Sequence, residues 1–240
     1  MLSNIRVVLL NTSHPGNIGA SARAMKTMGL RDLRLVNPKQ FPHAEATARA
    51  SGADDLLAQA AVYTHLDEAL EGCRLVIGAS ARLRSIPCPS VDPKDCARQV
   101  RTESAHGQVA LLFGCEQSGL SNAEIDRCHA LVRIPASDVY SSLNLAAAVQ
   151  VICYEVFAAH VTSETQEGDA DAHFTPVGAD DMERFYEHLE RTLVELEFLD
   201  PANPRQLMRR LRRLYNRARP DENEMNILRG ILTAAQAVRK

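Results

Sequence analysis

The chain has 240 residues, of which 45% are hydrophobic and 24% are charged, and its formal net charge is −3. This length is enough for one well-buried core with a small appended domain, and the composition is typical of a globular protein. The apolar runs are too short for a membrane span or a secretory signal, which favours a cytoplasmic location.

Strand and helix signals alternate over residues 5–160, which predicts an α/β domain. In chain order we expect strand Arg6–Leu10, helix Ile18–Met28, strand Asp32–Val36, helical pieces within Ala44–Ala61, strand Val62–Thr64, helix Asp67–Leu70, strand Leu75–Ala79, helix Pro93–Thr102, strand Gln108–Phe113, a capped helix start at Ser121–Glu124, strand Leu131–Ile134 and helix Asn144–His160. The strand before Gly114 is apolar without alternation, as expected when helices cover both faces of a sheet. The pattern predicts about six strands, mostly parallel.

The alternation stops after residue 162, and a different composition follows. Residues 163–181 are acidic and poor in aliphatic side chains, which is typical of a flexible linker. Beyond them, Met182, Phe185 and Leu189 begin an apolar stripe at helical spacing, and two more helical segments follow. We therefore expect a domain at 1–162, a linker at 163–181 and a small helical module at 182–240.

The helical module contains a block of positive charge. Seven arginines and no acidic residue lie between Pro201 and Pro220. A charge run is usually a solvated helix face, but the absence of acidic partners favours contact with phosphates. The candidate RNA-binding residues of this block are Arg209, Arg210, Arg212 and Arg213.

The cysteines predict no metal site. The chain has six of them, without a Cys-x-x-Cys pair or a zinc-type histidine spacing. Reduced thiols in apolar surroundings are the simpler interpretation.

Three polar loops follow strands and lead into helices, at 11–23, 113–122 and 134–149. Such loops at one edge of a sheet are the usual place for a binding site in an α/β protein. None carries the glycine fingerprint of a dinucleotide-binding or P-loop enzyme, so a dehydrogenase is disfavoured.

The three loops, taken in order, resemble motifs of the SPOUT methyltransferases, in the SpoU/TrmH branch that methylates ribose 2′-hydroxyls of RNA. The motifs are Asn17-Ile-Gly-Ala-Ser-Ala-Arg23, Leu112-Phe-Gly-Cys-Glu116 with Gly119-Leu120, and Ile134-Pro with Ser142-Leu-Asn144. The resemblance covers about the first 160 residues. It implies a trefoil knot in the C-terminal part of this domain and S-adenosylmethionine (SAM) as the methyl donor.

The resemblance also implies which residues form the site. Those expected to bind SAM are Ala79, Ser80, Ala81, Gly114, Ile134, Ser141, Ser142 and Leu143. Those expected at the catalytic centre are Arg23, Asn17, Glu116, Ser142 and Asn144. A guanidinium is a poor base because it stays protonated, so we expect Arg23 to hold a phosphate and stabilise the developing alkoxide.

Each of these residues also has a simpler interpretation. Arg23 alone would be a solvated charge, and Glu116 could cap local amides or pair with an arginine. Asn17, Ser142 and Asn144 stand near helix starts, where such side chains are favoured regardless of function.

The expected partners are tRNA and a second copy of the chain, because domains of this branch pair to complete the site. Within the branch the resemblance is strongest to enzymes that modify cytidine or uridine at position 32 of the anticodon loop. Arg82 and Arg84 beside the first knot loop are further candidates for contact with tRNA phosphates. Two alternatives remain, a ribosomal RNA 2′-O-methyltransferase and a non-catalytic RNA-binding protein on the same fold.

Overall fold

The computed structural model describes residues 1–81, 88–139, 141–161 and 176–237. The chain divides into two compact units, Met1–Gly168 and Asp169–Lys240. Arg82 and Arg84, which the sequence suggested for RNA binding, lie outside the described residues.

The described part of the first unit is built around a seven-stranded sheet, in the order β3-β2-β1-β6-β4-β7-β5. Its strands are β1 (Ile5–Leu10), β2 (Asp32–Val36), β3 (Ala61–Tyr63), β4 (Cys73–Ala79), β5 (Ser90–Val91), β6 (Gln108–Phe113) and β7 (Ala130–Val132). All the described strand pairs are parallel. The carboxyl ends of β1, β6, β4 and β7 are therefore neighbours at one edge of the sheet.

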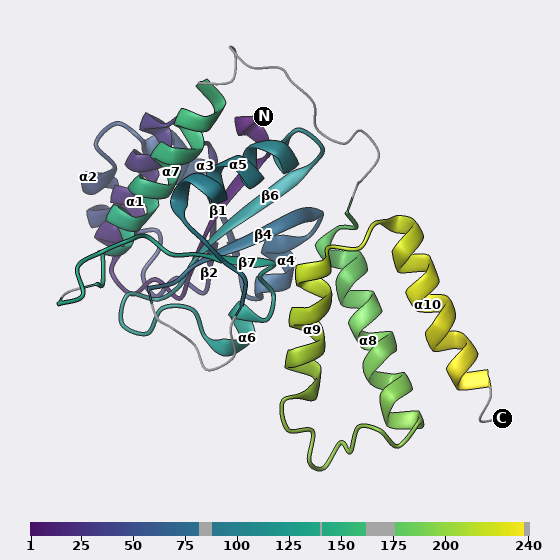
Figure 1. Ribbon diagram of the computed structural model, residues 1–240. Helices are drawn as coiled ribbons and strands as arrows, with labels where there is room; N and C mark the ends of the chain where they lie inside the picture. Colours follow the sequence, from purple (N-terminus) through teal and green to yellow (C-terminus); the bar gives the residue numbers. More distant parts are fainter. Residues whose placement is uncertain (82–87, 140, 162–175, 238–240) are drawn as a thin grey trace. The chain divides into compact units, whose positions relative to one another are not determined.

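Helices cover both faces of this sheet (Figure 1). The helices of the first unit are α1 (Pro15–Thr27), α2 (Ala44–Ala50), α3 (Asp54–Gln59), α4 (Leu66–Leu70), α5 (Pro93–Ser104), α6 (Asn122–Ile125) and α7 (Leu145–Val161), and a 3-10 turn at Leu2–Asn4 precedes β1. On β1, Val7 and Leu9 join the core formed with α1, α5 and α7. The neighbouring Arg6 faces the other side, where it donates to carbonyl oxygens at the end of α4. This arrangement confirms the predicted fold class, and the trefoil knot stays a prediction.

Two elements differ from the expectation. Helix α1 begins at Pro15 rather than near Ile18, because proline is well suited to the first helical position, where its missing amide is not needed. Strand β5 was not expected, since its two residues, Ser90 and Val91, are too few to show a periodic pattern. Its pairing with β7 at the edge of the sheet comes from the tertiary fold.

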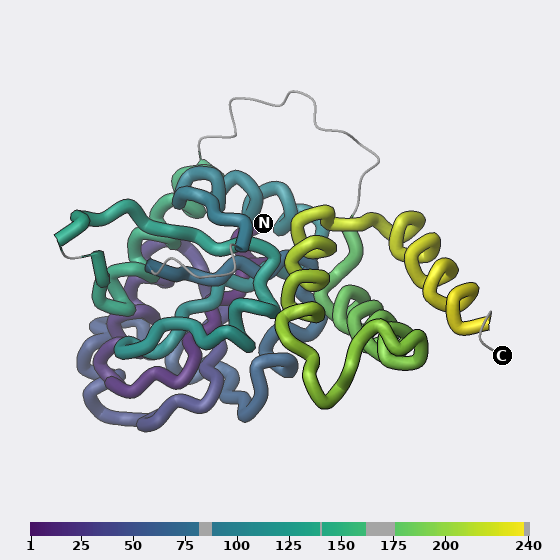
Figure 2. The backbone as a smooth tube through the Cα atoms, turned by 60° about the horizontal axis from the view of Figure 1, so that its bottom comes forward, coloured from purple at the N-terminus to yellow at the C-terminus, as the bar shows by residue number. Residues whose placement is uncertain are grey.

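The second unit consists of α8 (Ala179–Glu195), α9 (Leu207–Ala218) and α10 (Glu222–Ala237). A loop of 11 residues, 196–206, joins α8 to α9, and the two helices lie side by side (Figures 1 and 2). Phe185, Tyr186 and Leu189 of α8 and Met225 of α10 form the buried core of this unit. The unit thus has an apolar core of its own, which agrees with the stripe read from the sequence.

Candidate active site

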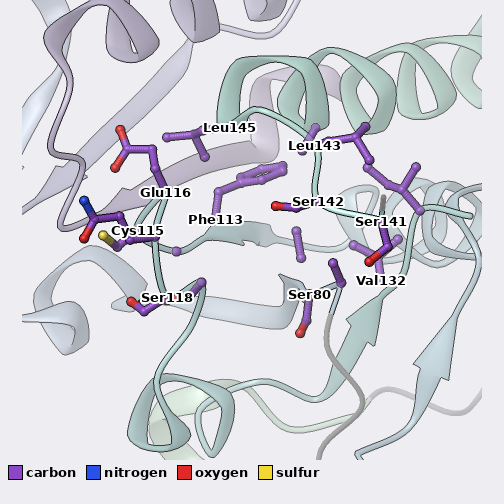
Figure 3. A pocket seen from close by; sticks show the side chains of 17 residues that line it. Ser80, Phe113, Cys115, Glu116, Ser118, Val132, Ser141, Ser142, Leu143 and Leu145 are labelled. Carbon is purple, nitrogen blue, oxygen red and sulfur yellow. Dashed lines mark hydrogen bonds between the residues drawn. The ribbon is translucent and has the colours of Figure 1, made fainter. Parts of the chain in front are cut away.

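A cavity of about 130 Å³ opens at the carboxyl ends of β4, β6 and β7 (Figure 3). The loops that follow these three strands and the first turns of α7 form its walls. All eight residues that the sequence suggested for SAM binding line it: Ala79, Ser80, Ala81, Gly114, Ile134, Ser141, Ser142 and Leu143. The structure therefore brings the eight residues together, and their role as SAM ligands stays a prediction.

The lining combines apolar surface with polar edges. Val132, Ile134 and Leu143 supply aliphatic surface, and Ser80 and Ser141 supply hydroxyl groups (Figure 3). A ligand with a flat ring and a hydrogen-bonding rim suits such a lining. The cavity therefore offers both apolar contacts and hydroxyl groups to a ligand.

Gly114 is needed for the shape of the loop itself. A Cβ atom at this position would lie 2.3 Å from the backbone carbon of Gly119 and 2.3 Å from the nitrogen of Leu120. These atoms belong to the same loop, which turns back at Gly119 with a φ of +66°. The folded loop itself therefore fills the space that a side chain at this position would need, and a role for Gly114 in binding SAM stays a prediction.

Glu116 joins two of the three loops. Its Oε2 atom accepts hydrogen bonds from the backbone amide and hydroxyl of Ser13, at 3.0 and 2.8 Å. Its Oε1 atom accepts from the amide of His14 at 3.2 Å and from the side chain of Asn17 at 2.9 Å. Both carboxylate oxygens are thus used to hold the loop between β1 and α1 against the loop after β6.

Asn144 adds the third loop to this network. Its Nδ2 atom donates to Oδ1 of Asn17 at 3.0 Å, and its Oδ1 atom accepts from the amide of Ala146 at 2.9 Å. Asn144 therefore caps α7 and binds α1 at the same time. The structure thus shows the capping role of this side chain, and its part in catalysis stays a prediction.

The surroundings of Glu116 stabilise its ionised form. Burial raises the pKa of this carboxyl group, but the hydrogen bonds from Asn17 and Ser13 outweigh the effect and lower the pKa to about 2. A carboxylate with so low a pKa is a weak proton acceptor at neutral pH. Glu116 is therefore suited to positioning the loops and unsuited to removing a proton from substrate.

The hydrogen bonds to Glu116 predict a pH-dependent stability. Because folding lowers the pKa from 4.5, the stabilisation is complete above about pH 5 and is lost as the pH falls towards 2. We expect Glu116→Gln to reduce the free energy of unfolding by about 2 kcal/mol at pH 7, since donors lose their charged acceptor. Urea denaturation between pH 7 and pH 3 should show this difference shrinking with acidity.

The matched control is Glu187→Gln, which changes an exposed glutamate of α8. We expect this variant to differ from the wild-type chain by the same small amount at every pH. A loss for Glu116→Gln that stays constant from pH 7 to pH 3 would contradict the assignment of the low pKa.

Arg23 does not line the cavity. It lies on α1 with its side chain exposed, and the described residues provide no hydrogen-bond or ion-pair partner for its guanidinium. The other four predicted catalytic residues lie at or beside the cavity. Ser142 and Glu116 line it, and Asn17 is hydrogen-bonded to both Glu116 and Asn144. The catalytic roles of all five residues stay predictions.

The arginines of the second unit have different surroundings. Arg212 forms two hydrogen bonds of 2.7 Å to the carboxylate of Glu183 and is not exposed. Arg210 is exposed, and Arg209 and Arg213 are half-buried. The four residues named from the sequence therefore do not form one uniform surface.

Ser13 was missed by the sequence interpretation. It makes two hydrogen bonds to Glu116, although 103 residues separate them. A serine two positions before Pro15 is common in loops, so its type and position gave no distinctive signal. Asn11 was missed in the same way: it has a φ of +52° and donates to Glu124 at 3.1 Å.

The described residues lack two further features, a metal-binding cluster and a membrane-spanning helix. Within these ranges no group of three or more His, Cys, Asp or Glu side chains is arranged to hold a metal ion. No helix in the described part of the chain combines the length and hydrophobicity needed to cross a membrane.

Comparison with known proteins identifies the family. Residues 4–154 match the model of the SpoU rRNA Methylase family, and residues 180–240 match that of the tRNA methyltransferase TrmJ, C-terminal domain. A relative from Pectobacterium atrosepticum, named tRNA (cytidine/uridine-2′-O-)-methyltransferase TrmJ, is 52% identical over 237 residues, which are 98% of each chain.

Solved structures agree with these matches. The crystal structure of TrmJ from Z. mobilis ZM4 has a TM-score of 0.82 and 31% identity, and the match covers 95% of this chain and 97% of that one. An AdoMet-bound rRNA methyltransferase from Sinorhizobium meliloti is 26% identical, with a TM-score of 0.52 over 64% of this chain and 55% of that one. The cavity at the strand ends, the two family models and the full-length relatives lead to one conclusion: the chain belongs to the SpoU methylase family and, within it, to the TrmJ methyltransferases.

Proposed function

We propose that this chain transfers a methyl group from SAM to the ribose 2′-hydroxyl of a nucleotide in tRNA. The observation that carries the proposal is the match along the whole chain to a relative named as a tRNA 2′-O-methyltransferase. The cavity supports it, because the eight residues expected to bind SAM all line one space. A non-catalytic RNA-binding protein would have no need of such a cavity.

The described residues fit SAM. The aliphatic side chains of Ile134 and Leu143 suit the faces of an adenine ring, and Ser80 and Ser141 provide hydroxyl groups at the rim. Bound SAM supplies a methyl group already activated by a positively charged sulfur, so the protein needs mainly to align the two reactants. The network of Ser13, Glu116 and Asn17 keeps the loops in place for this alignment.

Arg23 has a separate role in this mechanism. Its exposed guanidinium stays protonated and is free to bind the phosphate next to the reacting ribose. The same positive charge stabilises the alkoxide that develops as the 2′-hydroxyl loses its proton. This role needs no proton transfer to arginine.

The proposed target is cytidine or uridine at position 32 of the anticodon loop. The name of the Pectobacterium relative supports the choice of pyrimidines. Position 32 follows from the resemblance of the sequence to enzymes that act there. The proposal also includes a cytoplasmic location, where tRNA is available.

Methylation of purified RNA tests the function. The full chain is incubated with labelled SAM and tRNA from a strain that lacks this gene, and the product is digested and mapped by mass spectrometry. A 2′-O-methyl group at nucleotide 32 supports the proposal. Ribosomal RNA is the second substrate in the same assay, because the family model is described by rRNA methylation. Transfer to rRNA alone would refute the tRNA assignment.

We also propose that the protein is a homodimer that pairs through α7. Along this helix, apolar residues recur at a spacing of three and four on its outer side: Ala147, Val151, Tyr154, Ala158 and Val161. Tyr154 is 54% exposed and Val161 is 57% exposed. A helix that is apolar on all sides is normally covered on all sides, and a second copy of the helix would cover this stripe.

Light scattering tests the oligomeric state. A dimer has twice the chain mass of 26.4 kDa, and a monomer mass at micromolar concentration would refute the proposal.

The proposal for the domains follows the sequence: residues 1–162 carry the methyltransferase site, 163–181 form a linker and 182–240 bind tRNA.

A further inference from the structure

Helix α9 has one side that holds the second unit together. Met208, Leu211 and Tyr215 pack against the core formed by α8 and α10. The rings of Tyr215 and Phe185 pack nearly at right angles, with centroids 4.8 Å apart. These contacts fix the rotation of α9 about its own axis.

Arg212 belongs to the same structural side. Besides its two hydrogen bonds to Glu183, its guanidinium lies 4.4 Å from the centre of the Tyr186 ring. The hydroxyl of Tyr186 donates to the carbonyl of Arg212 at 3.0 Å and to Oδ1 of the buried Asn216 at 2.6 Å. The charge of Arg212 is paired with a carboxylate, and one face of its guanidinium is covered by a ring. Arg212 is therefore unsuited to binding a phosphate.

The opposite side of α9 is different. Arg210 and Arg217 are exposed, and within the described structure neither guanidinium has a hydrogen-bond or ion-pair partner. Leu214 lies between them and is 45% exposed. Residues seven apart share one face of a helix and are about 10.5 Å apart along its axis, so the two guanidiniums are able to contact different phosphates.

The charge around this face favours a polyanionic partner. No acidic residue lies between Pro201 and Pro220, and within the described residues neither Arg210 nor Arg217 is paired with a carboxylate of another element. Arg209 and Arg213 flank the face, and each already takes part in an interaction within the protein. The two exposed arginines are therefore the charges of α9 that are left for a ligand.

We propose that Arg210, Leu214 and Arg217 form the surface of α9 that contacts the phosphate backbone of tRNA, whereas Arg212 stabilises the helical unit. The proposal rests on the proposed function, which supplies the identity of the RNA. It adds Arg217, which the sequence interpretation did not name, and assigns Arg212 a structural role. It also explains why an arginine-rich helix is stable in this unit: one of its charges is neutralised inside the protein.

The salt dependence of tRNA binding tests this surface. The association constant for tRNA falls as salt rises. Each lost phosphate contact makes the slope of log association constant against log salt concentration less steep by about 0.7 to 0.9. We expect the full-length double variant Arg210→Gln, Arg217→Gln to bind tRNA about tenfold or more weakly, with a slope reduced by about 1.5. Filter binding from 50 to 200 mM salt measures both quantities.

Two further variants separate binding from folding. Arg191→Gln removes an exposed arginine of α8 that stands between Glu190 and Glu195, and we expect unchanged affinity and slope. Arg212→Gln should lower the melting temperature, whereas the double variant should have the same melting temperature as the wild-type chain. A double variant that melts normally and keeps the wild-type slope would overturn the proposal.

The same experiments distinguish this inference from the proposed function. If the wild-type chain does not methylate tRNA, the proposed function fails. If it methylates tRNA and the double variant does so with unchanged affinity, the proposed function stands and the surface lies elsewhere.

Discussion

Replacing Arg23 with alanine is expected to slow methyl transfer to tRNA by about a hundredfold or more while the affinity for SAM stays unchanged. Removing one group that stabilises a developing negative charge typically has an effect of this size. The affinity for SAM should not change, because Arg23 lies on the exposed side of α1 and does not line the cavity. Single-turnover kinetics measure the rate, and calorimetry with SAM measures the affinity.

Two further variants sharpen the test of Arg23. Arg23→Lys keeps the positive charge and loses the planar guanidinium. We therefore expect its rate of methyl transfer to lie between those of Arg23→Ala and the wild-type chain. Arg31→Ala removes an exposed arginine from the turn after α1 and should leave the rate unchanged. Weaker SAM binding by Arg23→Ala would show that the residue acts through the cofactor cavity and would contradict the role assigned to it.

The second large effect is expected at Gly19, where α1 and α2 touch. A Cβ atom at this position would lie 1.9 Å from the carbonyl oxygen of Ala46 and 2.8 Å from its carbon. Both are backbone atoms inside a helix, so they are unable to rotate away as a side chain would. We expect Gly19→Ala to reduce the free energy of unfolding by about 3 kcal/mol, measured by urea denaturation of the full chain.

Gly16 provides the control in the same helix. A Cβ atom there would meet only the ends of the Glu45 and His14 side chains, at 3.0 to 3.2 Å, and these are free to turn. We expect Gly16→Ala to change the stability by less than about 1 kcal/mol. Equal losses for the two variants would mean that the contact between α1 and α2 is looser than the structure indicates.

Much of the fold was predictable because its signals are local. Strand β6 is apolar without alternation, and it lies at the centre of the sheet with both faces covered. Helix α5 was expected from Pro93, and its Pro93 start is observed, with the side chain of Asp92 accepting from the amide of Asp95. Ser121 and Glu124 form the capping box that their spacing of three predicts.

The contacts that the sequence did not predict join residues that are distant along the chain. Ser13 and Glu116 meet because β1 and β6 are neighbours in the sheet, and no local pattern reveals that order. The sequence grouped Arg212 with its neighbouring arginines, although the packing of α9 against α8 gives it Glu183 as a partner. Motif and composition identify the candidate residues, whereas the rotation of a helix and the order of strands decide what each one touches.

The hydrogen bonds around Glu116 also constrain how this site is able to evolve. Ser13, Asn17, Glu116 and Asn144 exchange donors and acceptors in one connected set. A replacement at one of these positions leaves its partner without a hydrogen bond inside the protein, and a compensating replacement at another restores the balance. Natural variants of this chain that differ at one of the four positions should therefore differ at a second, so that the loops of the site change together.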